Sequence, residues 1–136
     1  MAQTQGTEFQ VRLDLPDPMP LTDVELCTVL GNLLDNAVEA CSRQTKGKRR
    51  ILVVGEIRGN MYFLKIENTY DGLILPEEKT FRSRKGTSAD HGIGLSSVRR
   101  ILENHGGDLD LVPGEETFLV GITIECPFIS KSQCVI

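Results

Sequence analysis

The sequence predicts a two-layer α/β sandwich, in which a mixed, mainly antiparallel sheet carries its helices on one face. Two observations lead to this fold class. Five apolar runs have the alternation or the β-branched content of strands, and two longer segments have the spacing of amphipathic helices. Their order is strand, helix, two strands, long loop, helix and two strands. Consecutive hairpins mixed with helices favour a sandwich, whereas a doubly wound sheet would need strict alternation of strand and helix.

The first strand and the first helix are marked by alternation and by a capping signal. Residues 8–15 alternate apolar and polar side chains, which predicts a half-buried strand, and three prolines then end it. Thr22 and Glu25, three residues apart, form a capping box that opens a helix running to about Gln44. Its expected apolar stripe consists of Leu26, Leu30, Leu33, Ala37 and Cys41, flanked by Cys27, Leu34 and Val38.

The remaining regular elements follow from similar signals. Further strands are predicted at residues 51–57, 61–67, 108–112 and 117–126, the first two joined by a glycine turn at 58–60 and the last two by a turn at 113–115. A second helix is predicted at residues 93–104, closed by Gly106 and Gly107. Residues 68–90 have no periodicity. A loop of this length inside a compact domain is more often a functional lid than filler.

Composition and charge narrow the class of protein. The 136 residues are 40% hydrophobic and 25% charged, an ordinary balance for one globular domain. The net charge of −4 gives no basic footprint for a nucleic-acid partner, and no apolar run approaches the roughly 20 residues of a membrane span. We therefore expect no nucleic-acid partner and no membrane contact by this chain. Residues 1–7 are expected to be a disordered or added leader, residues 8–128 the domain, and residues 129–136 a C-terminal tail.

The four cysteines indicate a reducing compartment. They form no C-x-x-C pair, and the two histidines are far from them in sequence, so a zinc site is poorly supported. Cys27 and Cys41 fall on the apolar stripe of the first helix, which favours buried, reduced thiols. Such thiols suit the cytosol.

A polar arc on the first helix is a candidate metal site. Asn32, Asp35, Asn36 and Glu39 fall within one narrow arc at helical spacing, and between Asn32 and Glu39 this arc carries no Lys or Arg. Asparagine is a mediocre helix former, so two of them one turn apart need a reason. The arc either faces water opposite the apolar stripe, or offers oxygen ligands to a hard cation such as Mg²⁺. Spacing alone leaves both interpretations open.

A glycine-rich segment before the second helix is a candidate phosphate site. Residues 85–98 read KGTSADHGIGLSSV and run directly into the helix. Free N–H groups and the positive dipole end of a helix form a cradle for phosphate, although the same pattern fits a flexible loop with an ordinary helix start. The segment is neither a dinucleotide-binding fingerprint nor a P-loop, because the required glycine spacings are absent.

Together, the two segments carry a more specific signal than either alone. Asn32 and Asn36 on a long first helix, followed by Gly92-Ile93-Gly94-Leu95 opening a later helix, resemble the GHKL ATPase superfamily. More narrowly, the chain is similar to the catalytic ATP-binding domain of sensor histidine kinases. The sequences of residues 34–40 and 91–95 are similar to those of the branch of peptide quorum-sensing receptor kinases. The resemblance covers about residues 8–126 and implies the Bergerat α/β sandwich.

The resemblance implies roles for individual residues. Asn36 matches the family's asparagine that holds Mg²⁺ against the ATP phosphates. Asn32 matches the position one turn earlier, which is a water-activating glutamate in hydrolytic members. An amide cannot act as a general base, and this suits transfer of phosphate to a protein. Asn32 and the lid cation Lys85 are the catalytic candidates, Lys85 because it would offset phosphate charge. The second glycine box, which would wrap the phosphates, comprises Gly92 and Gly94 together with Gly86, His91, Ile93 and Leu95.

The first glycine box departs from the family pattern. The family has D-x-G-x-G after a strand, with the Asp accepting a hydrogen bond from the adenine amino group, whereas this chain has Glu67-Asn68-Thr69-Tyr70-Asp71-Gly72. Aligned from the strand, Asn68 takes the Asp position and Gly72 that of the second glycine. Asp71 is the competing candidate for reading adenine, and the sequence leaves both open. An Asn oxygen can still accept from adenine, but its other end donates.

The resemblance implies a histidine kinase that binds ATP and Mg²⁺. The γ-phosphate would pass to a histidine on a separate dimerisation domain of the same receptor, and from there to a response regulator. The chain would be a cytoplasmic domain of a membrane-linked receptor. Two alternatives remain: a catalytically degenerate nucleotide-binding or interaction module, indicated by the altered first glycine box, and a serine kinase of the anti-sigma type, which shares the fold.

Overall fold

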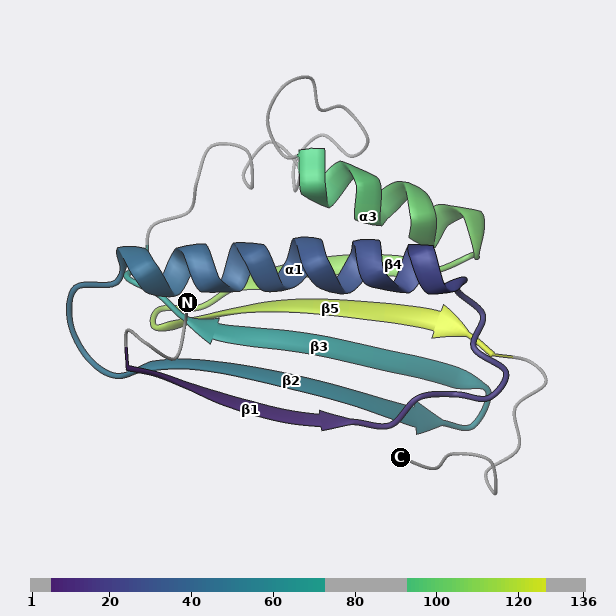
Figure 1. The fold of residues 1–136 in the computed structure, drawn as a ribbon, viewed down its shortest axis with the longest axis horizontal. Coiled ribbons are helices and arrows are strands. Elements are labelled where there is room, and N and C mark those ends of the chain that lie inside the picture. Colours follow the sequence, from purple (N-terminus) through teal and green to yellow (C-terminus); the bar gives the residue numbers. More distant parts are fainter. Residues whose placement is uncertain (1–5, 73–92, 127–136) are drawn as a thin grey trace.

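The described part of the chain forms two layers, a sheet and the helices that cover one of its faces (Figure 1). The structure is a computed structural model, and it describes residues 6–72 and 93–126. Within these residues the elements are β1 (Thr7–Leu13), α1 (Asp23–Arg43), β2 (Arg49–Arg58), β3 (Met61–Thr69), α3 (Ile93–Asn104), β4 (Asp108–Pro113) and β5 (Thr117–Glu125). The predicted element order is confirmed.

The sheet is mixed and mainly antiparallel, as the sequence predicts. Its strand order is β1-β2-β3-β5-β4. β1 pairs with β2 in parallel, and the other three pairs are antiparallel. The predicted hairpins form at the expected places, since Arg58 pairs with Met61 across the turn at Gly59 and Asn60. β5 lies between β3 and β4, so it is an inner strand, and β4 forms the edge opposite β1.

α1 begins where the capping box predicts. Thr22 is the N-cap, and its Oγ1 accepts a hydrogen bond from Glu25 N at 3.1 Å. Thr22 N in turn donates to Glu25 Oε1 at 2.9 Å. Two backbone N–H groups that the helix cannot satisfy by itself thus have partners. The helix ends at Arg43 with Gln44 as its C-cap, so the predicted length is also confirmed.

α3 has the predicted bounds and the predicted glycine stop. Gly106 has a φ of +69°, in the left-handed region that favours glycine after a helix. Gly107 N then donates to Leu102 O at 2.7 Å, so the chain reverses and leads straight into β4. This tight exit holds α3 on the same face of the sheet as α1 (Figure 1).

The core lies between the helices and the sheet. Its most buried side chains come from all the larger elements and include Val29, Leu33, Tyr62, Ile66, Val98, Leu102, Ile122 and Ile124. One expectation of burial was wrong. Cys27 was predicted to be buried, but it is exposed. Val29, which was not part of the predicted apolar stripe, is buried in the core instead. Val11 is 55% exposed, because β1 is the edge strand of the sheet. Cys41 is buried and free, as predicted.

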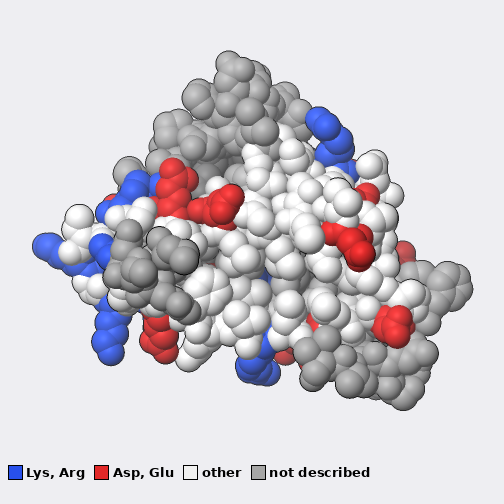
Figure 2. Space-filling model, viewed as in Figure 1, with Lys and Arg blue, Asp and Glu red and all other residues white. Residues whose placement is uncertain are grey.

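Charged side chains of both signs lie mainly toward the margins of the face shown in Figure 2, and uncharged side chains cover its centre. Among the described helices, none combines the length and the apolar character that crossing a membrane requires.

Candidate functional site

A pocket between α1 and the sheet gathers polar side chains from distant parts of the chain. Its polar lining consists of Asn36 and Arg43 from α1, Asn68 from β3, and Tyr70 just after β3. Its apolar walls are Leu33, Ala37, Ala40, Ile66, Leu95, Leu111, Phe118 and Val120. Apolar walls with a few converging polar groups are typical of small-molecule sites.

Asn68 enters this pocket because of the alternation of β3. Ile66, Asn68 and Tyr70 are all buried, on the face of the strand that the helices cover. Asn68 is 4% exposed, and its Nδ2 donates to Thr69 O at 3.0 Å. A carbonyl can only accept, so this bond fixes the orientation of the amide and leaves Oδ1 as its acceptor.

Asp71 and Gly72, the rest of the altered glycine box, lie elsewhere. Both are exposed. Asp71 lines a separate hollow beside the turn between α1 and β2, together with Lys46, Lys48 and Glu115. Of the two candidates for reading adenine, Asn68 is therefore the one that lies in the same pocket as Asn36.

The polar arc of α1 lies partly in solvent and partly against the core. Asp35 and Glu39 are exposed, whereas Asn32 and Asn36 are half-buried. Asn36 lines the pocket. The face therefore does not lie wholly opposite the apolar stripe: it has one solvated side and one side turned toward the core.

Asn32 lies against the start of α3. Its Nδ2 donates to Thr28 O, one turn earlier in α1, at 2.8 Å. Its Oδ1 is so close to Gly94 that a Cβ there would lie 2.8 Å away, nearer than side-chain carbons approach oxygens. Asn32 and Gly94, predicted as parts of one site, are thus in direct proximity.

The glycine-rich segment is described only from residue 93 onward. Ile93 begins α3, and Leu95 is 3% exposed and lines the pocket with Asn36. Lys85, Gly86, His91 and Gly92 lie outside the described residues. The rest of residues 73–92 and residues 127–136 lie outside them as well.

Arg43 is a pocket residue that the sequence analysis missed. It is seven residues after Asn36 and therefore on the same face of α1. The arc considered in the sequence ended at Glu39, one turn too early to include it. Arg43 Nε is buried and has no hydrogen-bond partner in the structure as described.

Tyr70 and Phe118 close the pocket from the sheet side. Their rings are edge to face, with centroids 5.6 Å apart and an interplanar angle of 88°. Tyr70 Oη donates to Gly114 O at 2.5 Å, which ties this wall to the turn between β4 and β5. The sequence offered a signal for Tyr70, because it continues the inward alternation of β3.

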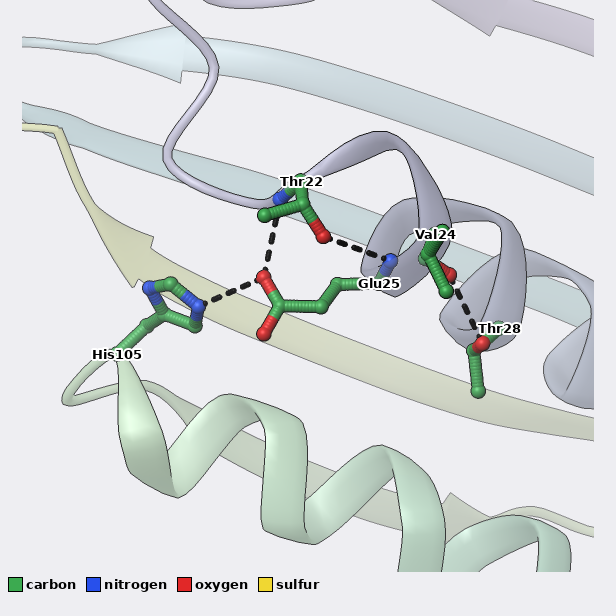
Figure 3. Close-up of polar contacts among 5 residues, drawn as sticks. All are labelled: Thr22, Val24, Glu25, Thr28 and His105. Atoms are coloured by element: carbon green, nitrogen blue, oxygen red, sulfur yellow. Dashed lines mark hydrogen bonds and ion pairs between the residues drawn. The ribbon is translucent and has the colours of Figure 1, made fainter.

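The N-terminal end of α1 and the C-terminal end of α3 are joined by a contact between two side chains, Glu25 and His105. His105 Nε2 lies 2.9 Å from Glu25 Oε1, the same oxygen that accepts from Thr22 N (Figure 3). The bond from the Thr22 backbone, followed by the contact with His105, lowers the pKa of Glu25 below its ordinary value of 4.5 despite partial desolvation. His105 lies directly after the last residue of α3.

The donor set fits a nucleotide. The pocket has a free volume of about 10 Å³, so its walls have to move apart to admit a base. Asn68 offers an acceptor, and the buried Nε–H of Arg43 offers a donor that lacks a partner within the described residues. Among the described residues no group of three or more His, Cys, Asp or Glu side chains could hold a metal ion. Mg²⁺ suits such a site, because it takes few protein ligands and keeps waters and phosphate oxygens as the rest.

The family follows from a direct match. The family model described as the GHKL domain matches residues 21–125 of this chain. The chain belongs to the GHKL domain family. The family resemblance is thereby confirmed, together with an ATP-binding function.

The relatives of this GHKL domain are sensor kinases. It is 32% identical over 99 residues to the sensor histidine kinase CitA of Klebsiella pneumoniae, a match that covers 68% of this chain and 17% of CitA. It is 33% identical over 131 residues to the sensor protein kinase CarS of Pseudomonas aeruginosa, covering 90% of this chain and 27% of CarS. The chain thus spans about a quarter or less of these relatives. It is an ATP-binding catalytic domain of the sensor histidine kinase kind.

Solved structures share the fold. The catalytic domain of histidine kinase ThkA superposes with a TM-score of 0.70 at 19% identity, over 92% of this chain and 82% of that one. Acinetobacter baumannii histidine kinase AdeS gives a TM-score of 0.63 at 18% identity, over 93% of this chain and 57% of that one. At these identities the likeness establishes the fold, which confirms the predicted α/β sandwich.

Proposed function

We propose that this GHKL domain binds Mg-ATP and serves the transfer of its γ-phosphate to a histidine on a separate dimerisation domain, from which a response regulator receives it. The observation that carries the proposal is the pocket in which Asn36, Asn68 and Leu95 lie together. These residues come from the three segments in which the sequence places the family's metal asparagine and its two glycine boxes.

Within this proposal, α1 and β3 hold the two ends of the nucleotide. Asn68 Oδ1 accepts from the adenine amino group, and the apolar walls move apart to admit the base and then enclose it. Asn36 supplies an amide oxygen to Mg²⁺, which would neutralise phosphate charge. Gly92 and Gly94, with Gly86, His91, Ile93 and Leu95, form the phosphate-side segment, and Lys85 adds a positive charge. Asp71 and Gly72 lie outside the pocket and have no contact with the base in this proposal.

Asn32 supports transfer to a protein rather than to water. Its amide has no basic site with which to take a proton from water. Its Nδ2 is already engaged with Thr28 O, and its Oδ1 is turned toward Gly94. In this proposal Asn32 places the start of α3 beside the nucleotide.

The wider setting is also a proposal. We infer a cytoplasmic catalytic domain of about residues 8–128 within a membrane-linked receptor, of the peptide quorum-sensing branch. One support is the similarity to sensor kinases, of which this chain covers only a part. The other is the amino-acid sequence of residues 34–40 and 91–95. A degenerate module remains the second candidate, because Asn68 stands where the family has Asp.

The test is a transfer assay with the receptor's own histidine-bearing helices. The domain is mixed with γ-labelled ATP, Mg²⁺ and the dimerisation domain of the same receptor, with Asn36→Ala as the inactive control. We expect label on the dimerisation domain that is labile to acid and stable to base, as a phosphohistidine is. Bound nucleotide without transfer would favour the degenerate module, and acid-stable label on a partner protein would favour a serine kinase.

A further inference from the structure

Arg43 carries a donor that the structure leaves without a partner. Its Nε is inaccessible to solvent and unpaired within the described residues, and the side chain lines the same pocket as Asn36 and Asn68. A buried N–H normally has an acceptor, because leaving one unpaired is costly. An unpaired donor in the wall of a pocket is therefore a place where a ligand can supply the acceptor.

The ion pair of Arg43 does not account for this nitrogen. Arg43 Nη1 lies 3.9 Å from Glu39 Oε2, at the outer limit of such contacts, and the Glu39 side chain is 63% exposed. A pair this long and this solvated contributes little. It also engages a terminal nitrogen of the guanidinium group and leaves Nε turned to the interior.

Asn68 and Arg43 together present one acceptor and one donor to the pocket. Asn68 Oδ1 is the acceptor, because Nδ2 is held by Thr69 O. Adenine offers a matching pair, since its amino group donates and the ring nitrogens beside it accept. Guanine has a carbonyl oxygen in place of that amino group, so it would set an acceptor against Asn68 Oδ1. Guanine also carries a hydrogen on N1, so it would set a donor against Arg43 Nε–H.

We propose that Arg43 is a base-reading residue of this pocket, whose Nε–H donates to N1 of adenine while Asn68 Oδ1 accepts from the amino group. The inference rests on the proposed nucleotide site and adds the residue that completes its preference for adenine over guanine. Arginine is suited to this role, because it keeps its charge at every physiological pH and its N–H groups have fixed directions.

The test compares two nucleotides on two proteins. Titration calorimetry with non-hydrolysable ATP and GTP analogues, each with Mg²⁺, is carried out on the parent and on Arg43→Lys, which retains the charge and loses Nε–H. We expect Arg43→Lys to bind the ATP analogue about tenfold more weakly, the loss of one hydrogen bond from a charged donor, and the GTP analogue almost unchanged. The ratio of the affinity for the ATP analogue to the affinity for the GTP analogue is therefore smaller in Arg43→Lys than in the parent.

Two controls separate this role from a structural one. Glu39→Gln removes the ion pair and does not alter the lining of the pocket. The affinity of this variant for the ATP analogue should stay within about twofold of that of the parent, as expected for an exposed pair. An ATP analogue whose base lacks N1 should bind the parent more weakly than the unmodified analogue does, and Arg43→Lys should bind the two equally well. An analogue that lacks N7 should bind the parent unchanged. This second readout needs no variant that could lose its fold.

The outcomes are distinct. If Arg43→Lys melts like the parent and keeps the parent's adenine-to-guanine ratio, the role of Arg43 is overturned and the proposed nucleotide site stands. If the loss of N1 from the base does not weaken binding to the parent, the role is likewise overturned. If the parent binds neither analogue, the proposed function fails, and the role of Arg43 fails with it.

Discussion

Asn32 Oδ1 occupies the space that a side chain on Gly94 would need, since a Cβ there would lie 2.8 Å from this oxygen. The Asn32 amide is held in place from its other end, where Nδ2 donates to Thr28 O. α1 and α3 therefore approach each other closely at this point, and the approach depends on one residue having no side chain. Leu95, the next residue of α3, is thereby placed in the wall of the pocket.

Gly94→Ala should force α1 and α3 apart. Because the Asn32 amide is tethered, we expect a loss of about 1–3 kcal/mol in the free energy of unfolding, as for other overpacked sites, and a lower Tm. The measurement is urea unfolding. Gly31→Ala is the matched control on α1: no atom lies within 4 Å of its added Cβ, so it should stabilise the helix by about 0.5–1 kcal/mol. Equal stability of Gly94→Ala and the parent would show that the contact is not tight.

Asn36→Ala should abolish the Mg²⁺ dependence of nucleotide binding without unfolding the domain. The substitution removes the one amide of α1 that both lines the pocket and matches the family's metal asparagine. Calorimetry with an ATP analogue, with and without Mg²⁺, measures the effect, and thermal melting checks the fold. Asp35→Asn, at the exposed neighbouring position, should bind like the parent. Undiminished Mg²⁺-dependent binding by Asn36→Ala would remove this residue from the site.

The Glu25 carboxylate should stabilise the fold above its ordinary pKa and lose this effect in acid. Its pKa is lowered in the folded state, first by the Thr22 N–H and then by His105. A lowered folded pKa means that the unfolded chain binds a proton more readily, so the contribution is complete above pH 4.5 and disappears as the pH falls through the folded pKa.

Unfolding by urea across this acid range measures the effect. Glu25→Gln keeps the capping geometry but cannot titrate, and it should show a shallower loss of stability in acid than the parent. His105→Gln should reduce the slope less, because the Thr22 bond is the larger cause. Identical acid slopes for Glu25→Gln and the parent would contradict this account.

The native thiols should differ sharply in reactivity. Cys27 is exposed, whereas Cys41 and Cys126 are buried. Burial also raises the pKa of the Cys126 thiol, and the thiolate is the reactive form. In a Cys134→Ser background, we expect one fast-reacting thiol with Ellman's reagent, none after Cys27→Ser, and the other two only in denaturant. More than one fast thiol in the native protein would show that α1 or the end of β5 opens readily.

Local signals in the sequence were sufficient for most elements. Thr22 and Glu25 located the start of α1 because a capping box satisfies backbone groups within one turn, and Gly106 located the end of α3 for the same kind of local reason. The exposure of Cys27 was not predictable in this way. Which flank of a helix faces the core depends on where the sheet and α3 lie, and these are long-range contacts.

The candidate site could be read only in part. The sequence left Asn68 and Asp71 as equals, although the alternation Tyr62, Leu64, Ile66 already runs inward and extends to Asn68. Arg43 was missed because the polar arc was ended at Glu39, and because a buried, unpaired Nε is visible only once α1 is packed on the sheet. The close approach of Asn32 to Gly94 joins residues 62 positions apart, which no local pattern encodes.

Titration of the isolated domain with a non-hydrolysable ATP analogue, in the presence and absence of Mg²⁺, tests the central claim most directly. The pocket of Asn36, Asn68 and Arg43 predicts binding that depends on Mg²⁺ and is lost in Asn36→Ala. A folded domain that binds no analogue at millimolar concentration, with or without Mg²⁺, would contradict the account.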